Sequence, residues 1–253
     1  MYQIPELLRF PRLFHAFSTK ADSNMANSIL GKVNDFNQVL INRKKFLDSI
    51  DIFFDDCICL WVIGKDGVSV ARPKDAGVSI SNYKKAVRKD ALITDKSRLF
   101  LFMLIADCAP VIIYDPVNNA LGLVHVGWKG ANLEIVNKVI KRLSDLYGTQ
   151  PEDLIVGIGP AARKESFIKE NPSQKDDPKW SGFITPADKN FYKVDFVGLC
   201  KKQLVESGMK HTNIFDSGID TVTDNRFFSH VLEGKLPLSS QGRFACVVGI
   251  RPL

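Results

Sequence analysis

Residues 104–130, LIADCAPVIIYDPVNNALGLVHVGWKG, hold two apolar segments that are joined by a turn. Cys108 stands before the first of these segments, the asparagines at 118–119 supply the turn, and His125 lies near the end of the second. Apolar runs of this length are typical of strands that are buried on both faces. The sequence therefore predicts a hairpin that brings Cys108 and His125 side by side.

Helices and strands are predicted on both sides of this hairpin. Apolar residues recur at helical spacing in residues 37–50, 132–147 and 194–206. Short apolar runs predict strands at residues 13–18, 58–63, 99–105, 111–114, 120–126, 154–158 and 244–250. Because the strands come in groups and the helices stand apart, we expect an α+β fold. It would be a single domain, residues 1–253, of mixed β-sheets flanked by helices.

One segment breaks the apolar pattern. Residues 169–182, KENPSQKDDPKWSG, are rich in proline, lysine, aspartate and serine, and this composition predicts an exposed loop. Apolar segments lie on both sides of it, so we expect an excursion within the same domain.

The bulk composition favours a cytoplasmic globular protein. No apolar run approaches the ~20 residues that cross a membrane, and the first residues show no secretory signal pattern. The five cysteines are an odd number at low density, which argues against a disulfide framework. The net charge is +6, but the basic residues are scattered, so we expect neither a nucleic-acid nor a membrane partner. A small anionic substrate would explain the basic excess equally well.

The cysteine and histidine of the hairpin support two kinds of chemistry. A thiolate beside an imidazole can act as a nucleophile. Cysteine and histidine are also ligands for zinc and copper. A third interpretation is structural, since both residue types also occur as satisfied core residues. Composition and spacing leave all three interpretations of Cys108 and His125 open.

Glycine and lysine residues follow His125. Gly127 and Gly130 allow a tight turn or a close approach of the backbone to a ligand. Lys129 lies between them, shortly before the helix predicted at residues 132–147. Free amides at a helix start and the positive end of the helix dipole favour an anion. We therefore expect Lys129 to take part in an anion site.

Three sequence blocks carry a resemblance to a known family. They are ADCAPVIIYDP at residues 106–116, VHVGWKG at 124–130 and GIGPA at 157–161. Supporting blocks are HAFSTK at 15–20, KDALIT at 89–94, RFFSH at 226–230 and QGRFACVVGI at 241–250. The order and spacing of these blocks resemble the laccase-domain family, also called the multicopper polyphenol oxidoreductase family, whose bacterial members are known as the peptidoglycan editing factor.

The resemblance implies an α+β fold related to Cys–His hydrolase folds. It also implies a metal site, usually zinc and less often copper, made by two histidines and one cysteine. Cys108 and His125 match two of these three metal-binding or catalytic residues. Activities attributed to the family are purine nucleoside phosphorolysis, adenosine deamination, polyphenol oxidation and correction of misloaded peptidoglycan precursors. No nucleotide cofactor is expected, because the chain has neither a G-x-G-x-x-G nor a G-K-[ST] motif.

The chain departs from the family pattern at positions that bear on the site. The family's other histidine lies in a QVHG segment, and residues 61–64 read WVIG, so Ile63 stands at the histidine position and should face the Cys–His pair. Lys20 and Lys129 stand where the family usually has arginine, and lysine lacks the bidentate fork of arginine. Together with Arg243, these lysines are the expected substrate-binding cations. With one ligand lost, zinc should bind less tightly.

The leading prediction is an enzyme that acts on purine nucleosides, by phosphorolysis, adenosine deamination or both, at a Cys–His site that zinc would complete. Its partners would be small molecules, namely a nucleoside and phosphate. The sequence does not indicate an oligomeric state. One alternative is a cytoplasmic amidase that edits peptidoglycan precursors. Another is a degenerate, non-catalytic member that binds a ligand or partner, which the loss of histidine at Ile63 favours. Copper-dependent polyphenol oxidation is the weakest, because four histidines cannot supply several histidine-rich copper sites.

Overall fold

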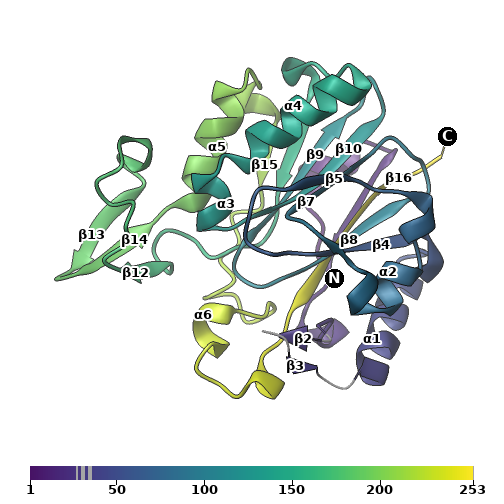
Figure 1. The fold of residues 1–253 in the computed structure, drawn as a ribbon, viewed down its shortest axis with the longest axis horizontal. Helices are drawn as coiled ribbons and strands as arrows, with labels where there is room; N and C mark the ends of the chain where they lie inside the picture. Colours follow the sequence, from purple (N-terminus) through teal and green to yellow (C-terminus); the bar gives the residue numbers. More distant parts are fainter. Residues whose placement is uncertain (27, 30–31, 34–35, 253) are drawn as a thin grey trace.

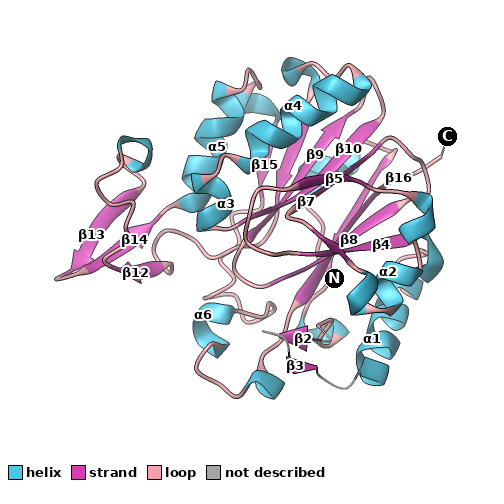
Figure 2. Cartoon of the chain, in the orientation of Figure 1, coloured by secondary structure: helices cyan, strands magenta, loops and turns pink. Residues whose placement is uncertain are grey.

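The structure is a computed structural model that describes residues 1–26, 28–29, 32–33 and 36–252. Two mixed β-sheets pack face to face, and helices cover their outer faces (Figures 1 and 2). This arrangement confirms the predicted α+β fold. In the described part of the chain, no helix is both long enough and apolar enough to cross a membrane.

The first sheet has five strands in the order β1-β16-β8-β4-β6. Their bounds are β1 Leu13–Phe17, β16 Phe244–Ile250, β8 Phe100–Ile105, β4 Cys57–Trp61 and β6 Val87–Arg88. β16 is antiparallel to both β1 and β8, whereas β4 is parallel to β8 and β6. The strand predicted at residues 58–63 ends at Trp61, so Ile63 lies in the loop after the end of β4.

The second sheet has six strands in the order β15-β11-β9-β10-β7-β5. Their bounds are β15 Ile214–Asp216, β11 Ile155–Ile158, β9 Ala109–Asp115, β10 Ala120–Val126, β7 Ala91–Thr94 and β5 Val68–Val70. β9 and β10 form the antiparallel hairpin that the sequence predicts. β7 pairs with the other edge of β10, and this pairing brings the start of β7 close to the end of the hairpin.

The core has three layers because the central strands bury both faces. Leu101 and Met103 of β8 point between the two sheets, whereas Phe100 and Phe102 point to the opposite side. That opposite side is covered by helix α1, Phe36–Asp48. The outer face of the second sheet is covered by α4, Ile135–Tyr147, and α5, Phe196–Glu206. The described residues also form three short helices, α2 Val78–Ser81, α3 Trp128–Asn132 and α6 His230–Glu233.

The helix predicted at residues 132–147 is interrupted near its start. A separate short helix, α3, spans Trp128–Asn132, and α4 begins at Ile135. Glu134, between them, has a φ of 56° and a left-handed conformation that no α-helix continues through. The chain therefore changes direction between the two helices.

A small third sheet projects from the body of the molecule (Figure 1). It consists of β12 Ile168–Glu170, β14 Phe191–Val194 and β13 Ile184–Asp188. The exposed loop predicted at residues 169–182 is partly wrong, since its first residues belong to β12 and Trp180 is buried. Trp180 Nε1 donates to Asn132 Oδ1 at 2.8 Å and fastens this excursion to α3. A further pair of strands, β2 Ser28–Ile29 and β3 Lys32–Val33, lies near α1.

Candidate active site

Cys108 lies at a corner of the chain, where β8 ends at Ile105 and β9 begins at Ala109. The corner is made by Asp107, whose φ of 73° is uncommon for a residue other than glycine. Asp107 is buried, and its backbone carbonyl accepts the N–H of Ala162 at 2.8 Å. Strained backbone of this kind persists only when its surroundings hold it, and it is frequent at functional sites.

His125 comes from the neighbouring strand β10. The strand register pairs Val126 with Ala109, so the residues one step further along, Gly127 and Cys108, face each other. A Cβ atom at Gly127 would lie 2.8 Å from Cys108 Sγ and 3.9 Å from His125 Cε1, so a glycine is needed to leave room for the thiol. Both side chains therefore lie against Gly127, and the charge of Cys108 acts on His125. The structure thus brings together the two residues that the hairpin predicts to be neighbours.

A buried carboxylate, Asp90, holds the other ring nitrogen of His125. Asp90 Oδ1 lies 2.9 Å from His125 Nδ1, and the backbone N–H of His125 donates to the Asp90 carbonyl at 2.8 Å. The same carboxylate accepts the N–H groups of Ile63, Gly64 and Lys65 at 3.2, 2.8 and 2.8 Å. Burial raises the pKa of Asp90, but the hydrogen bonds from His125 and the backbone outweigh it and hold the pKa below its usual value.

The charges of Cys108 and Asp90 decide the protonation of His125. Burial lowers the pKa of His125, whereas the Cys108 thiolate and the Asp90 carboxylate raise it, and the net result is a pKa of about 9. His125 is therefore an imidazolium at neutral pH. Because Asp90 occupies Nδ1, the ring nitrogen left to exchange its proton with a ligand is Nε2.

The three side chains form a relay of thiol, imidazole and carboxylate. This is the arrangement of a nucleophile, a base and the group that orients the base. Cys108 is partly exposed, and the His125 side chain is 12% exposed, so a ligand can reach both. The relay can transfer a proton through His125, attack with the Cys108 thiolate, or place a negative charge beside a reacting cation.

Asp90 is a site residue that the sequence alone does not single out. It lies directly before β7 and reaches His125 because β7 pairs with β10, with Ala91 opposite Val124. The signal that could have identified it is an acidic residue at the start of an apolar strand, inside a block that resembles the family.

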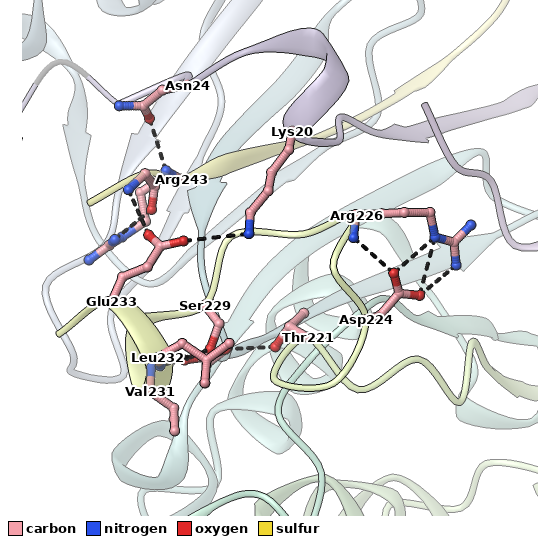
Figure 3. Close-up of polar contacts among 12 residues, drawn as sticks. Lys20, Asn24, Thr221, Asp224, Arg226, Ser229, Val231, Leu232, Glu233 and Arg243 are labelled. Carbon is pink, nitrogen blue, oxygen red and sulfur yellow. Dashed lines mark hydrogen bonds and ion pairs between the residues drawn. The ribbon is translucent and has the colours of Figure 1, made fainter. Parts of the chain in front are cut away.

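Two of the three predicted substrate-binding cations lie in one cluster (Figure 3). Lys20 begins a 3₁₀ turn after β1, and its Nζ lies 3.8 Å from Glu233 Oε1. Arg243 precedes β16, and its Nη1 donates to the Gly242 carbonyl at 2.6 Å. Burial lowers the pKa of Arg243, whereas the charges of Asp107, Glu233 and Cys108 raise it. The structure therefore brings Lys20 and Arg243 together around the Glu233 carboxylate.

Lys129 lies in the first turn of the short helix α3, not at the start of α4. It belongs to α3, and the longer helix α4 starts beyond the turn at Glu134. Lys129 is exposed and forms no ion pair with any residue in the described ranges. α3 has five residues, so the helix dipole at Lys129 is that of a short helix. A role of Lys129 in substrate binding stays a prediction.

A three-ligand zinc site does not fit the residues around Cys108. Within residues 1–26, 28–29, 32–33 and 36–252, no group of three or more His, Cys, Asp and Glu side chains is placed to hold a metal ion. Asp90 faces Nδ1 of His125, not the thiol. His15 is buried in β1, while His211 and His230 begin a 3₁₀ turn and α6. Catalytic zinc normally needs three protein ligands, so the described side chains around Cys108 do not fit a catalytic zinc ion.

The position of Ile63 offers a test of this ligand count. Its backbone N–H binds Asp90, the partner of His125, whereas the predicted direction of its side chain stays a prediction. Ile63→His should supply the third ligand and raise bound zinc to about one ion per chain. Metal analysis after equilibration with zinc measures this. Lys65→His is the control, because Lys65 is exposed and binds the same carboxylate through its backbone. Equal zinc content in Ile63→His and the parent would contradict the placement.

Comparisons with known proteins agree with the sequence blocks. The family described as multi-copper polyphenol oxidoreductase laccase matches residues 17–251. Purine nucleoside phosphorylase YlmD of Bacillus subtilis (strain 168) is 25% identical over 234 residues, which are 87% of this chain and 80% of the relative. A purine nucleoside phosphorylase of Xylella fastidiosa (strain Temecula1 / ATCC 700964) is 28% identical over 196 residues, 75% of this chain and 71% of the relative.

Solved structures share the fold. The Bacillus licheniformis hypothetical protein YfiH superposes with a TM-score of 0.85 at 23% identity, covering 97% of this chain and 94% of the other. YlmD from Geobacillus stearothermophilus gives a TM-score of 0.84 at 21% identity, with 96% and 93% covered. Since the family match extends over residues 17–251, this chain belongs to the laccase-domain family, described as multi-copper polyphenol oxidoreductase laccase.

Proposed function

We propose that the chain catalyses the phosphorolysis of purine nucleosides at the relay of Cys108, His125 and Asp90. Two relatives that match most of the chain are named purine nucleoside phosphorylase. The observation that carries the proposal is the placement of His125, whose Nδ1 lies 2.9 Å from Asp90 and whose ring lies against the same glycine as Cys108. The charges of Cys108 and Asp90 raise the pKa of His125 to about 9 and keep a proton on it.

Proton transfer is the first contribution of the relay. The reaction breaks the bond between purine N9 and sugar C1′ and forms a bond between C1′ and a phosphate oxygen. The departing purine is a poor leaving group unless it is protonated, so a general acid beside it lowers the barrier. His125 Nε2 donates this proton to the purine and recovers one from dihydrogen phosphate as the new bond forms.

Electrostatic stabilisation is the second contribution. The sugar becomes oxocarbenium-like in the transition state, as in other glycoside cleavages. Cys108, which acts as a thiolate in this proposal, places a negative charge near the developing cation, and Asp90 orients the imidazole. Lys20 and Arg243 are the candidate cations for phosphate, with Lys129 as a third.

Phosphorolysis is favoured over the metal-dependent activities of the family. Adenosine deamination needs a metal-activated water, and the described residues around Cys108 and His125 provide two ligands where three are required. Copper-dependent oxidation, which the family description suggests, meets the same difficulty. Phosphorolysis at this relay needs only side chains and phosphate.

A second candidate function draws on the same relay. A thiol, an imidazole and a carboxylate in series also suit an amidase. Cys108 would attack the amide carbonyl, the amine would leave with a proton from His125, and water would hydrolyse the thioester. This chemistry corresponds to the predicted editing of peptidoglycan precursors. The non-catalytic alternative has less support, because the relay is complete despite Ile63.

Product analysis with and without phosphate tests the proposal. Purified protein incubated with inosine, adenosine or guanosine should release the free base and ribose 1-phosphate only when phosphate is present, as chromatography would measure. Base release that does not depend on phosphate, or conversion of adenosine to inosine, would contradict phosphorolysis. A thioester that hydroxylamine traps during incubation with a muramyl-peptide amide would instead support the amidase.

A further inference from the structure

Glu233 is a carboxylate that lies between two cations of the candidate site. Its Oε1 is 3.8 Å from Lys20 Nζ, and its Oε2 accepts the N–H of Gly242, the neighbour of Arg243, at 2.9 Å. Figure 3 shows the Glu233 carboxylate between the side chains of Lys20 and Arg243. Only 12% of the Glu233 side chain is exposed, although the lysine is 40% exposed. The carboxylate thus lies where an anion between these cations would bind.

The neighbour of Cys108 holds Glu233 in this place. Asp107 Oδ2 accepts the N–H of Val231 at 2.6 Å and the hydroxyl of Ser229 at 3.2 Å. Ser229 caps the start of α6, and Glu233 is the last residue of that helix. The corner that carries Cys108 therefore also positions the helix that carries Glu233.

The cluster holds charges of both signs. Lys20 and Arg243 are basic, and Glu233 and Asp107 are acidic. Burial lowers the pKa of Arg243, while the charges of Asp107, Glu233 and Cys108 raise it, so these groups act on one another. Phosphate would add negative charge beside a carboxylate that is already paired with the lysine, and like charges at this range repel.

We propose that Glu233 determines the anion specificity of the site: an oxyanion such as phosphate binds Lys20 and Arg243 by displacing the Glu233 carboxylate. Naming phosphate rests on the proposed phosphorolysis, whereas the competition between carboxylate and oxyanion does not. α6 has four residues, none of them buried, and Val231 and Leu232 on it are exposed. A movement of this helix therefore uncovers little core.

Glu233→Gln tests the proposal, because glutamine removes the charge and keeps an oxygen for the N–H of Gly242. The variant should bind inorganic phosphate about tenfold more tightly than the parent at low ionic strength. Calorimetric titration of each full-length protein with inorganic phosphate alone measures this. Phosphate binding by Glu233→Gln that is unchanged or weaker would overturn the proposal.

Asp224→Asn is the matched control for net charge. Asp224 belongs to the same C-terminal segment, and its Oδ2 accepts from Arg226 Nη2 at 2.7 Å. Figure 3 shows this pair apart from the Glu233 carboxylate. Asp224→Asn should leave phosphate affinity within about twofold of the parent, since the charge of Asp224 lies outside the cluster and is already paired with Arg226. An equal gain in both variants would show that overall charge controls binding, and would also overturn the proposal.

Lys20→Gln provides a second measurement. In the Glu233→Gln background, loss of the lysine should weaken phosphate binding more than it does in the parent, where Glu233 already pairs with it. Equal effects in both backgrounds would overturn the proposal. In nucleoside assays, Glu233→Gln should lower the KM for phosphate with little change in kcat. If no variant turns over a nucleoside, the proposed function fails, while the phosphate titration still decides the role of Glu233.

Discussion

Cys108→Ala should lower the turnover of a purine nucleoside by about a hundredfold to a thousandfold, the usual cost of removing one preorganised electrostatic group. The substitution removes the sulfur that the proposed mechanism places beside the developing sugar cation. It also removes the first of the charges that raise the pKa of His125. The kcat at saturating nucleoside and phosphate measures the effect. Because Cys108 is only partly buried, the melting temperature should change little.

Cys200→Ala is the matched control. Cys200 is buried in α5, and burial raises the pKa of its thiol to about 12, so it stays uncharged at neutral pH. Its removal should reduce the free energy of unfolding more than Cys108→Ala does, and leave turnover close to that of the parent. If Cys108→Ala keeps more than about a tenth of parental turnover, the thiolate does not supply the stabilisation that is typical of such groups.

The pH profile gives a second measure of the same interaction. The pKa of His125 is raised to about 9, so the protonated general acid is present below this pH and is lost as the pH rises through it. Turnover of the parent should therefore decline on the alkaline side near this value. Without Cys108 the decline should move to lower pH. A decline at the same pH in both proteins would show that the thiolate does not sustain the imidazolium.

The central strands are the part of the fold that the sequence predicts best. β8, β9, β10 and β16 are continuous apolar runs because the two sheets and the outer helices bury both of their faces. β5, β12 and β13 escape prediction because they are short and only partly buried, so no apolar run marks them. The break before α4 is not predicted either. Apolar residues recur at helical spacing across Glu134, but the left-handed backbone of Glu134 ends the helix there.

The candidate site divides in the same way. Cys108 and His125 lie on adjacent strands of one hairpin, and the local pattern is enough to pair them. Asp90 joins them through the β7–β10 pairing, a contact between separate segments that periodicity does not reveal. Glu233 reaches Lys20 from the far end of the chain, so the balance of charge at the predicted cations emerges only from the fold. The sequence predicts Lys20 and Arg243 as substrate-binding cations, and the fold places the Glu233 carboxylate between them.

Acidification from about pH 7 to about pH 4 should cost the folded protein about 3 kcal/mol through His15 alone. His15 is fully buried in β1, and burial lowers its pKa from 6.5 to about 4. Its Nε2 accepts the N–H of Ile4 at 2.8 Å, and its Nδ1 has no hydrogen-bond partner among the described residues. Above pH 6.5 the ring is neutral in both states. Between pH 6.5 and about 4 the histidine is protonated in the unfolded chain but stays neutral in the folded chain. The free energy of unfolding therefore decreases as the pH falls to the folded pKa.

His15→Gln separates this contribution from the other groups that titrate in acid. Glutamine does not titrate, and its side-chain oxygen can accept the N–H of Ile4 in place of the imidazole. The variant should be less stable than the parent near pH 7, because the amide fits the ring's space poorly, yet lose about 3 kcal/mol less on acidification. Urea unfolding at both pH values measures the two differences. His211→Gln, at an exposed histidine, should keep the full acid sensitivity of the parent. If His15→Gln keeps it as well, the buried ring is not what makes the fold acid-labile.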